Sequence, residues 1–258
     1  MSLSGHLARL RAARRRALVC YVTAGHPDRS ASLRLLRELA GAGADVIEVG
    51  VPFSDPLADG PVIQASSQRA LDLGMTLDGT LALVAESRPT IPVVLFSYLN
   101  PLLAAGGDVL TRAAAAGVQG VLVTDLPVGM DAEREAWLGG GPLEFIRLVA
   151  PTTPVERMAE IVKHGSGFVY LISRLGVTGV QSEVAADLPS SLADLRSVCP
   201  LPICVGFGIS TAAQAYEIGA VADGIVVGSA LVRAAESGVD SALALVRELR
   251  AALDSLPA

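Results

Sequence analysis

The sequence is poor in the residues that most often build metal centres and disulfide frameworks. Its three histidines are His6, His26 and His164, and its three cysteines are Cys20, Cys199 and Cys204. The histidines are widely separated and the cysteines match no zinc or redox spacing, so the sequence does not predict a metal site. Cys20 and Cys204 stand in apolar, strand-like runs, which is typical of buried, reduced thiols. We therefore expect a reducing compartment and a cytoplasmic protein.

The sequence also lacks long apolar runs and an excess of positive charge. No apolar run approaches the roughly 18 residues of a membrane span, although the mean hydropathy is +0.50. The net charge is -6 and the isoelectric point is near 5.1, whereas proteins that bind nucleic acid present basic surfaces to phosphate. The sequence therefore predicts neither a membrane nor a nucleic acid as partner.

Positive charge is concentrated before the first acidic residue, Asp28, where the arginines are Arg9, Arg11, Arg14, Arg15 and Arg16. One interpretation is an organelle transit peptide, which is rich in arginine and poor in acidic residues. We favour a short N-terminal helix over residues 3–14, because a core strand already begins near Ala17. The last turn of a helix also favours cations.

Strand and helix patterns alternate along the whole chain. Apolar runs predict strands at 17–22, 45–49, 91–97, 118–123, 145–149, 168–172, 203–206 and 224–227. Helices are expected over 62–73, 77–87, 131–138, 155–163, 192–198, 211–218 and 241–253, with another that ends at Gly41 and one alanine-rich helix up to Gly117. Pro151 to Pro154 reads as a turn with N-cap residues. With no linker in 258 residues, we predict one domain over 1–258, a (β/α)8 TIM barrel with a short N-terminal helix.

The stretch 47–61, IEVGVPFSDPLADGP, carries a carboxylate near each end. Glu48 lies within an apolar strand, where an ionised carboxylate costs several kcal/mol unless it is paired or its pKa rises. Asp59 lies in a loop stiffened by prolines that follows the strand end, where barrels place their chemistry. The alternatives are a structural glutamate at Glu48 and turn or N-cap roles for Asp55 and Asp59. We predict that Glu48 and Asp59 are the catalytic pair.

Glycine-rich segments follow the last two predicted strands, at 206–210 and 228–229. Barrels commonly bind phosphate there, through backbone N–H groups and a helix N-terminus. Either segment by itself could simply form a tight turn, but together they predict a phosphate site. Neither contains lysine or arginine. The polar stretch 173–187, with Gly176 and Gly179, indicates a mobile lid or, alternatively, a disordered surface insertion.

Six motifs along the chain read, in order, YVTAGHP, EVGVPFSDPLADGP, TDLP, YLISRLGVTG, GFGIS and VGSALV. By these motifs the chain resembles the tryptophan synthase alpha subunit family over nearly its whole length. The resemblance implies a lyase of L-tryptophan biosynthesis that cleaves indole-3-glycerol phosphate to indole and glyceraldehyde 3-phosphate, by a retro-aldol reaction without a cofactor. Glu48 would move protons at indole C3 and at the glyceryl hydroxyl, and Asp59 would bind the indole N–H and stabilise the indolenine.

The resemblance also implies the remaining site residues. The indole or glyceryl pocket would be lined by Tyr21, Thr23, Phe96, Tyr98, Leu126, Tyr170 and Thr178. The phosphate would be held by Gly179, Phe207, Gly208, Gly228 and Ser229, with Thr178 and Gly179 belonging to the lid. A beta subunit that receives indole is implied as partner in an alpha2beta2 tetramer, with Asp55, Asn100 and residues 125–130 near the interface.

Three residues depart from the family pattern: His26 replaces a frequent acidic residue, Tyr21 a phenylalanine and Phe96 a leucine. These departures bear on the pocket shape rather than on the carboxylates. The alternative functions are a stand-alone indole-3-glycerol-phosphate lyase, a largely allosteric scaffold subunit, and an isomerase or epimerase of sugar phosphates. An isomerase or epimerase would need a metal or another acid/base pair, and the small number of histidines argues against this alternative.

Overall fold

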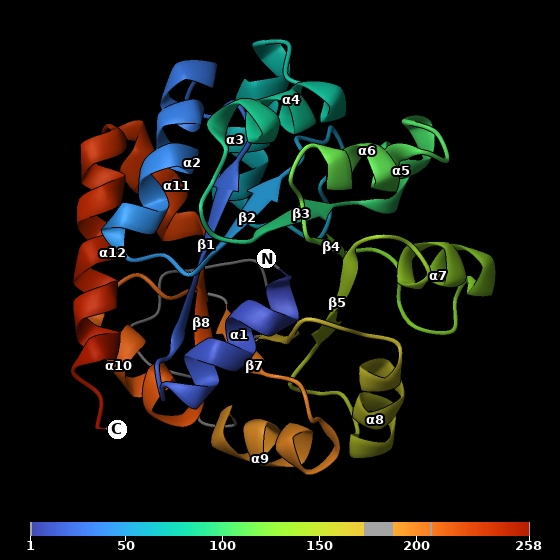
Figure 1. The fold of residues 1–258 in the computed structure, drawn as a ribbon, viewed down its shortest axis with the longest axis vertical. Helices are drawn as coiled ribbons and strands as arrows, with labels where there is room; N and C mark the ends of the chain where they lie inside the picture. Colours follow the sequence, from blue (N-terminus) through green and yellow to red (C-terminus); the bar gives the residue numbers. More distant parts are fainter. Residues whose placement is uncertain (1, 173–187, 207, 258) are drawn as a thin grey trace.

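Eight parallel strands close into a barrel in the computed structural model, which describes residues 2–172, 188–206 and 208–257 (Figure 1). The strands are β1 (Ala17–Thr23), β2 (Val46–Gly50), β3 (Val93–Ser97), β4 (Gly120–Val123), β5 (Glu144–Val149), β6 (Val169–Ile172), β7 (Ile203–Gly206) and β8 (Gly224–Val227). Each strand pairs with the next, and β8 pairs with β1 through Ala17 and Gly224. The predicted (β/α)8 TIM barrel is confirmed.

Helices surround the strands, on the outside of the barrel except for the first, which lies across one end (Figure 1). In the described part of the chain they are α1 (Leu3–Ala12), α2 (Arg29–Ala42), α3 (Pro61–Asp72), α4 (Leu77–Ser87), α5 (Leu99–Ala104), α6 (Val109–Ala115), α7 (Ala132–Gly139), α8 (Val155–Lys163), α9 (Leu188–Val198), α10 (Ala212–Val221), α11 (Ser229–Glu236) and α12 (Val239–Asp254). The loops between a strand and its following helix all open at the carboxyl ends of the strands, so this end is where a site is expected.

The core has two layers because successive strand residues point to opposite faces of the sheet. On β2, Ile47 and Val49 belong to the large apolar cluster between strands and helices, whereas Val46 belongs to the cluster inside the barrel. Leu3 and Leu7 of α1 also belong to the inner cluster. Helix α1 therefore closes the amino-terminal end of the barrel, which leaves the opposite end for function.

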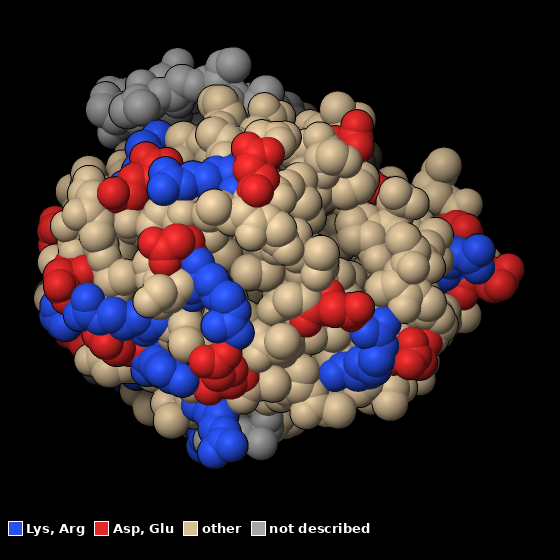
Figure 2. Space-filling model, turned by 90° about the horizontal axis from the view of Figure 1, so that it is seen from above, with Lys and Arg blue, Asp and Glu red and all other residues tan. Residues whose placement is uncertain are grey.

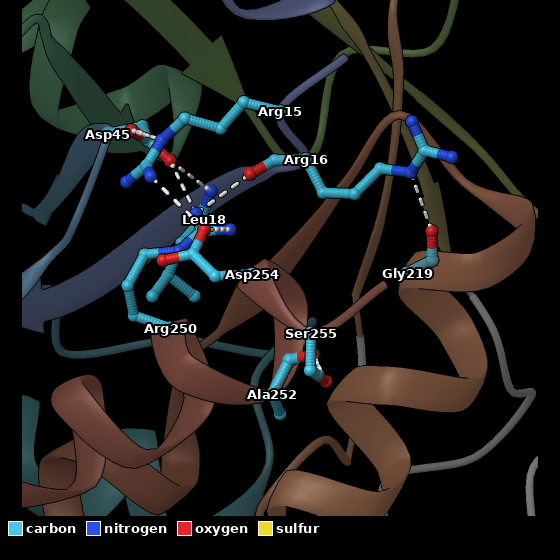
Figure 3. A network of polar contacts seen from close by, with 9 residues as sticks. All are labelled: Arg15, Arg16, Leu18, Asp45, Gly219, Arg250, Ala252, Asp254 and Ser255. Carbon is cyan, nitrogen blue, oxygen red and sulfur yellow. Dashed lines mark hydrogen bonds and ion pairs between the residues drawn. The ribbon is translucent and has the colours of Figure 1, made fainter. Parts of the chain in front are cut away.

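A network of charged side chains and backbone groups connects the elements at the same amino-terminal end of the barrel (Figure 3). Asp45, just before β2, accepts hydrogen bonds from the Leu18 backbone N–H at 2.9 Å and from the Arg250 guanidinium at 3.1 Å, and Arg15 lies 3.3 Å away. Arg250 also donates to the carbonyl of Arg16 at 2.8 Å. These contacts join β1, β2 and α12 far from the carboxyl ends of the strands, so they serve the fold.

Several predicted helix boundaries were wrong for local reasons. Helix α2 continues through Gly41 to Gly43, whose φ of +109° forms the left-handed cap. The single alanine-rich helix is two helices, α5 and α6, separated at Gly106, whose φ is +96°. The turn before α8 offers no side-chain cap, because Pro154 occupies the N-cap position.

Two further helix predictions differ from the structure in the carboxyl-terminal third of the chain. Helix α9 begins at Leu188 rather than at residue 192, and α11 was not predicted at all. Helix α11 begins directly at Ser229 after β8, within the segment that we had interpreted as a phosphate site without giving bounds for a helix. The turn is therefore also a helix N-terminus.

The surface carries mixed charge. On the face drawn in Figure 2, acidic and basic side chains lie next to one another rather than in separate fields. Ion pairs such as Arg34 with Glu38 and Arg112 with Asp108 follow the four-residue helix spacing. Among the residues that the structure describes, no helix combines the length and the apolar character needed to cross a membrane.

Candidate active site

Glu48 lies inside the barrel at the middle of β2. Its strand neighbours face the outer cluster, so alternation turns its carboxylate inward. Its side chain is only 1% exposed, and its Oε1 is buried without a hydrogen-bond partner in the described residues. Burial raises the pKa of Glu48 to about 8, because the charged form loses its hydration. Glu48 is therefore a carboxylic acid that exchanges a proton near neutral pH.

Asp59 is fixed by a tyrosine from the neighbouring strand. The Tyr98 hydroxyl donates to Asp59 Oδ2 at 3.1 Å and accepts from the Ala58 backbone N–H at 2.9 Å. Burial raises the pKa of Asp59 to about 6, and the hydrogen bond from Tyr98 partly opposes this shift. Asp59 is not an N-cap, because Gly60 and Pro61 begin α3. It is therefore mostly ionised at neutral pH and held in one place.

Tyrosine and phenylalanine side chains surround the two carboxylates. Tyr21 pairs in register with Glu48, and its ring meets Phe96 edge-on at 5.2 Å between centroids. The pKa of Tyr170 is raised well above its ordinary value by burial first and then by the nearby charge of Glu48. Thr23 is buried and shares a 2.7 Å hydrogen bond with Ser66 of α3. The structure thus brings Tyr21, Thr23, Phe96, Tyr98 and Tyr170 to the end of the barrel that holds both carboxylates.

Two glycines make room for the tyrosine hydroxyls. A Cβ at Gly50 would lie 2.1 Å from the Tyr21 hydroxyl oxygen, and one at Gly206 would lie 2.2 Å from that of Tyr170. Both distances are far below van der Waals contact, so any side chain at these glycines displaces a tyrosine. Sequence reasoning missed both roles, because the contact partners are distant in the chain.

We expect Gly206→Ala to lower kcat/KM by about tenfold or more, because a displaced Tyr170 changes the pocket wall beside Glu48. Overpacking should also destabilise the fold by about 1 to 3 kcal/mol. Steady-state kinetics and thermal unfolding would measure both effects. Gly41→Ala is the matched control: it lies within α2 with open space around it, so it should keep full activity. Wild-type kinetics in Gly206→Ala would show that the glycine is not needed for the pocket.

The glycine-rich turns after β7 and β8 lie where the sequence predicted. Gly208 has a φ of +83° and open space at its Cβ position. Gly228 is the N-cap of α11 and provides no side-chain cap, so the first N–H groups of that helix have no intrahelical acceptor. An anion is favoured at such a terminus. Three predicted residues, Thr178, Gly179 and Phe207, lie outside the described residues.

The predicted pocket residue Leu126 comes three residues after β4 (Gly120–Val123). It packs in the outer apolar cluster, whereas Leu122 of β4 packs inside the barrel in the same cluster as Tyr170. The register pairs Leu122 with Phe96, whose side chain also contacts the inner cluster. Leu122 was not among the predicted pocket residues, and its alternation with Val121 and Val123 places it inside the barrel.

His26 is buried beside α11. It is 3% exposed, neither ring nitrogen has a hydrogen-bond partner in the described residues, and Nε2 lies 3.7 Å from a Glu236 carboxylate oxygen. Burial lowers the pKa of His26, so the ring is neutral at neutral pH. His26, which replaces an acidic residue frequent in the family, therefore affects packing between the β1–α2 loop and α11 rather than the carboxylates.

A closed (β/α)8 barrel with one buried and one half-buried carboxylate, tyrosines and phosphate-type turns at the carboxyl ends of its strands is typical of a barrel enzyme that works by acid/base chemistry. A sequence model of the tryptophan synthase alpha chain family matches residues 7–256. The chain belongs to this family.

Similar proteins agree with this assignment. The chain is 47% identical over 235 residues to the tryptophan synthase alpha chain of Desulfatibacillum aliphaticivorans, covering 90% of this chain and 89% of that protein. It is 48% identical over 248 residues to that of Chromobacterium violaceum, covering 93% and 95%. A solved structure of Mycobacterium tuberculosis tryptophan synthase contains a chain with a TM-score of 0.90 and 39% identity, covering 97% of both chains.

Proposed function

We propose that Glu48 and Asp59 carry out, in this chain, the alpha reaction of tryptophan synthase. This reaction cleaves indole-3-glycerol phosphate into indole and glyceraldehyde 3-phosphate. The observation that carries the proposal is the pairing of a buried acid with a pKa of about 8 and a fixed carboxylate with a pKa of about 6 at the same end of the barrel.

Glu48 is the general acid and then the general base. Cleavage of the carbon–carbon bond requires a proton on indole C3 and the loss of the proton from the glyceryl hydroxyl. At neutral pH the buried Glu48 is mostly protonated, so it can give its proton to C3. The carboxylate that results takes the hydroxyl proton as the bond breaks and the indole leaves. A group with a pKa near the working pH is efficient in both directions.

Asp59 is the electrostatic partner. Protonation at C3 gives the indole ring a positive charge, which is shared by its N–H group. An ionised carboxylate that accepts a hydrogen bond from this N–H stabilises the cation without reorganising. Tyr98 keeps the Asp59 carboxylate in place by its 3.1 Å hydrogen bond. Tyr21, Thr23, Phe96 and Tyr170 would enclose the substrate, together with Leu122 or Leu126.

The phosphate group would lie on Gly208, Gly228 and Ser229, with Gly179 and Phe207 as further contacts and Thr178 in the lid. Support comes from the uncapped N-terminus of α11 at Gly228 and Ser229. The site contains no lysine or arginine at 206–210 or 228–229, so backbone N–H groups and the helix dipole would hold the dianion.

The partner that we propose is a tryptophan synthase beta subunit, in an alpha2beta2 tetramer. Support comes from exposed apolar side chains on the segments that follow β2, β3 and β4: Leu57 in the loop after β2 is 88% exposed, Leu103 in α5 40% and Met130 in the loop after β4 74%. Since these segments all lie at the catalytic end, a partner there would cover the exit of indole. Asp55, Asn100 and residues 125–130 lie on the same segments.

The test is indole formation from indole-3-glycerol phosphate by the purified chain, with and without a beta subunit. Activity that rises when the beta subunit is added supports the proposal. High activity that does not change on addition would indicate a stand-alone lyase. Activity absent under both conditions would contradict the lyase proposal and favour a scaffold role.

We expect kcat/KM to have a bell-shaped dependence on pH. Asp59 must be ionised, so the rate should fall as the pH drops below about 6. Glu48 must be protonated to begin the reaction, so the rate should also fall as the pH rises above about 8. Initial rates in a constant-ionic-strength buffer series would measure both limbs. A rate that stays flat above pH 8 would contradict the role of Glu48 as the acid.

A further inference from the structure

The outer face of β5 carries an arginine where apolar packing is expected. On β5, Phe145 and Val149 belong to the outer apolar cluster, and Arg147 alternates with them on the same face. Arg147 is only 4% exposed. A buried guanidinium costs several kcal/mol unless it is paired and hydrogen-bonded, so its partners should show why it is there.

The partners of Arg147 lie in α7, at the end of α8 and in the loop of residues 124–131 between β4 and α7. Its guanidinium donates to Glu135 Oε2 at 2.9 Å, to the Leu126 carbonyl at 3.3 Å and to the His164 carbonyl at 3.0 Å. The other oxygen of Glu135 accepts from the Gly129 backbone N–H at 2.6 Å. Arg157 of α8 donates to the Val128 carbonyl. Three side chains thus hold the backbone of this loop at 126, 128 and 129, and we call Glu135, Arg147 and Arg157 the loop clamp.

The clamped loop reaches the catalytic end by a further hydrogen bond. Asp125 Oδ1 accepts from the Leu99 backbone N–H at 2.7 Å. Leu99 directly follows Tyr98, whose hydroxyl holds Asp59. The reaction becomes slower when a carboxylate that must face the developing charge moves by about 1 Å. The loop is therefore tied to the residue that positions Asp59.

We propose that the loop clamp is a set of positioning residues, which orders the β4–α7 loop so that Asp125 fixes the start of α5 and Tyr98 fixes Asp59. This inference rests on the proposed function of Asp59 in cleavage. This role explains why the Arg147–Glu135 ion pair is buried, although apolar side chains of similar volume would make the protein equally or more stable. The pair specifies one loop conformation.

The test replaces the buried pair by apolar residues in the full chain, as Arg147→Met with Glu135→Leu. We expect the exchange of the Leu99 backbone amide hydrogen to become about tenfold faster, because the loop loses two hydrogen bonds that hold its backbone. We also expect kcat/KM for indole formation to fall by about tenfold. The matched control is Arg250→Met with Asp45→Asn, which removes the other buried pair at the opposite end of the barrel and should leave both quantities unchanged.

Arg157→Met tests the same clamp without touching buried charge, because Arg157 is exposed and gives the loop one hydrogen bond. It should speed the Leu99 exchange by about two- to tenfold. Wild-type exchange at Leu99 in both clamp variants would overturn the inference. Wild-type kcat/KM together with faster exchange would also overturn it, since the loop would then not position Asp59. An inactive wild-type chain would contradict the proposed function instead, while the exchange measurement would still test the clamp.

Discussion

Replacing Glu48 with glutamine should lower kcat for indole formation by about 10³-fold or more, because general acid and base steps contribute about 10² to 10⁴ each. Glutamine has nearly the same shape and volume but transfers no proton at neutral pH. The side chain is 1% exposed inside the barrel, so no bulk water replaces the lost acid. Single-turnover kinetics with indole-3-glycerol phosphate would isolate the chemical step. Residual turnover within tenfold of wild type would remove Glu48 from the proton transfers.

The same variant should be more stable than the wild type at alkaline pH, which separates loss of chemistry from loss of fold. The native pKa of Glu48 is about 8, above its ordinary value of 4.5, so the native state retains a proton that the unfolded chain releases. The wild type therefore loses stability as the pH rises from about 4.5 to about 8, and glutamine does not. At about pH 9 we expect the variant to be more stable by about 5 kcal/mol. Urea unfolding at several pH values would measure this difference.

A matched control for Glu48 is Glu144, a glutamate at the other end of the barrel. Its carboxylate accepts the Ser4 backbone N–H at 3.0 Å and fixes α1. Glu144→Gln should leave kcat and KM unchanged. A comparable loss of rate in both variants would show that the barrel, rather than the proton transfer at Glu48, had been disturbed.

Replacing Asp59 with asparagine should lower kcat/KM by about 10² to 10³-fold, the loss typical of removing one preorganised electrostatic group. Asparagine can still accept a hydrogen bond from the indole N–H, but it has no charge to offset the cation that forms when C3 is protonated. The acidic limb of the pH profile, near 6 in the wild type, should disappear in this variant. Unchanged kinetics would exclude Asp59 from the mechanism.

Variants of two neighbours of Asp59 test its role further, one as a control and one as a milder change. Asp55 lies in the same loop, is exposed and accepts from Ser54 at 2.5 Å, so Asp55→Asn should retain the activity of the isolated chain. Tyr98→Phe removes the hydroxyl that holds Asp59 while keeping the ring that packs on Phe53. It should reduce the rate in the same direction as Asp59→Asn, but less, because the carboxylate charge remains.

The sequence predicted the order of the barrel well because its signals are local. Apolar runs separated by helical periodicity are sufficient to find eight strands, and Gly60 with Pro61 predicts the start of α3. Boundaries failed where one residue could serve two conformations, as at Gly41, which lies inside α2 while Gly43 forms the cap. Leu126 and Leu122 illustrate a second limit, since the apolar cluster that a leucine joins is decided by tertiary packing.

The sequence by itself determined which carboxylates could act, because Glu48 within an apolar strand and Asp59 after its end are visible in a short stretch of letters. Only the tertiary structure decided what they can do. The pKa of Glu48 depends on burial by the whole barrel, and Asp59 depends on a hydroxyl 39 residues away. The loop clamp likewise joins α7, β5 and α8. Desolvation and hydrogen bonding act between groups that are close in space, and closeness in space is set by the closed barrel rather than by the order of the residues.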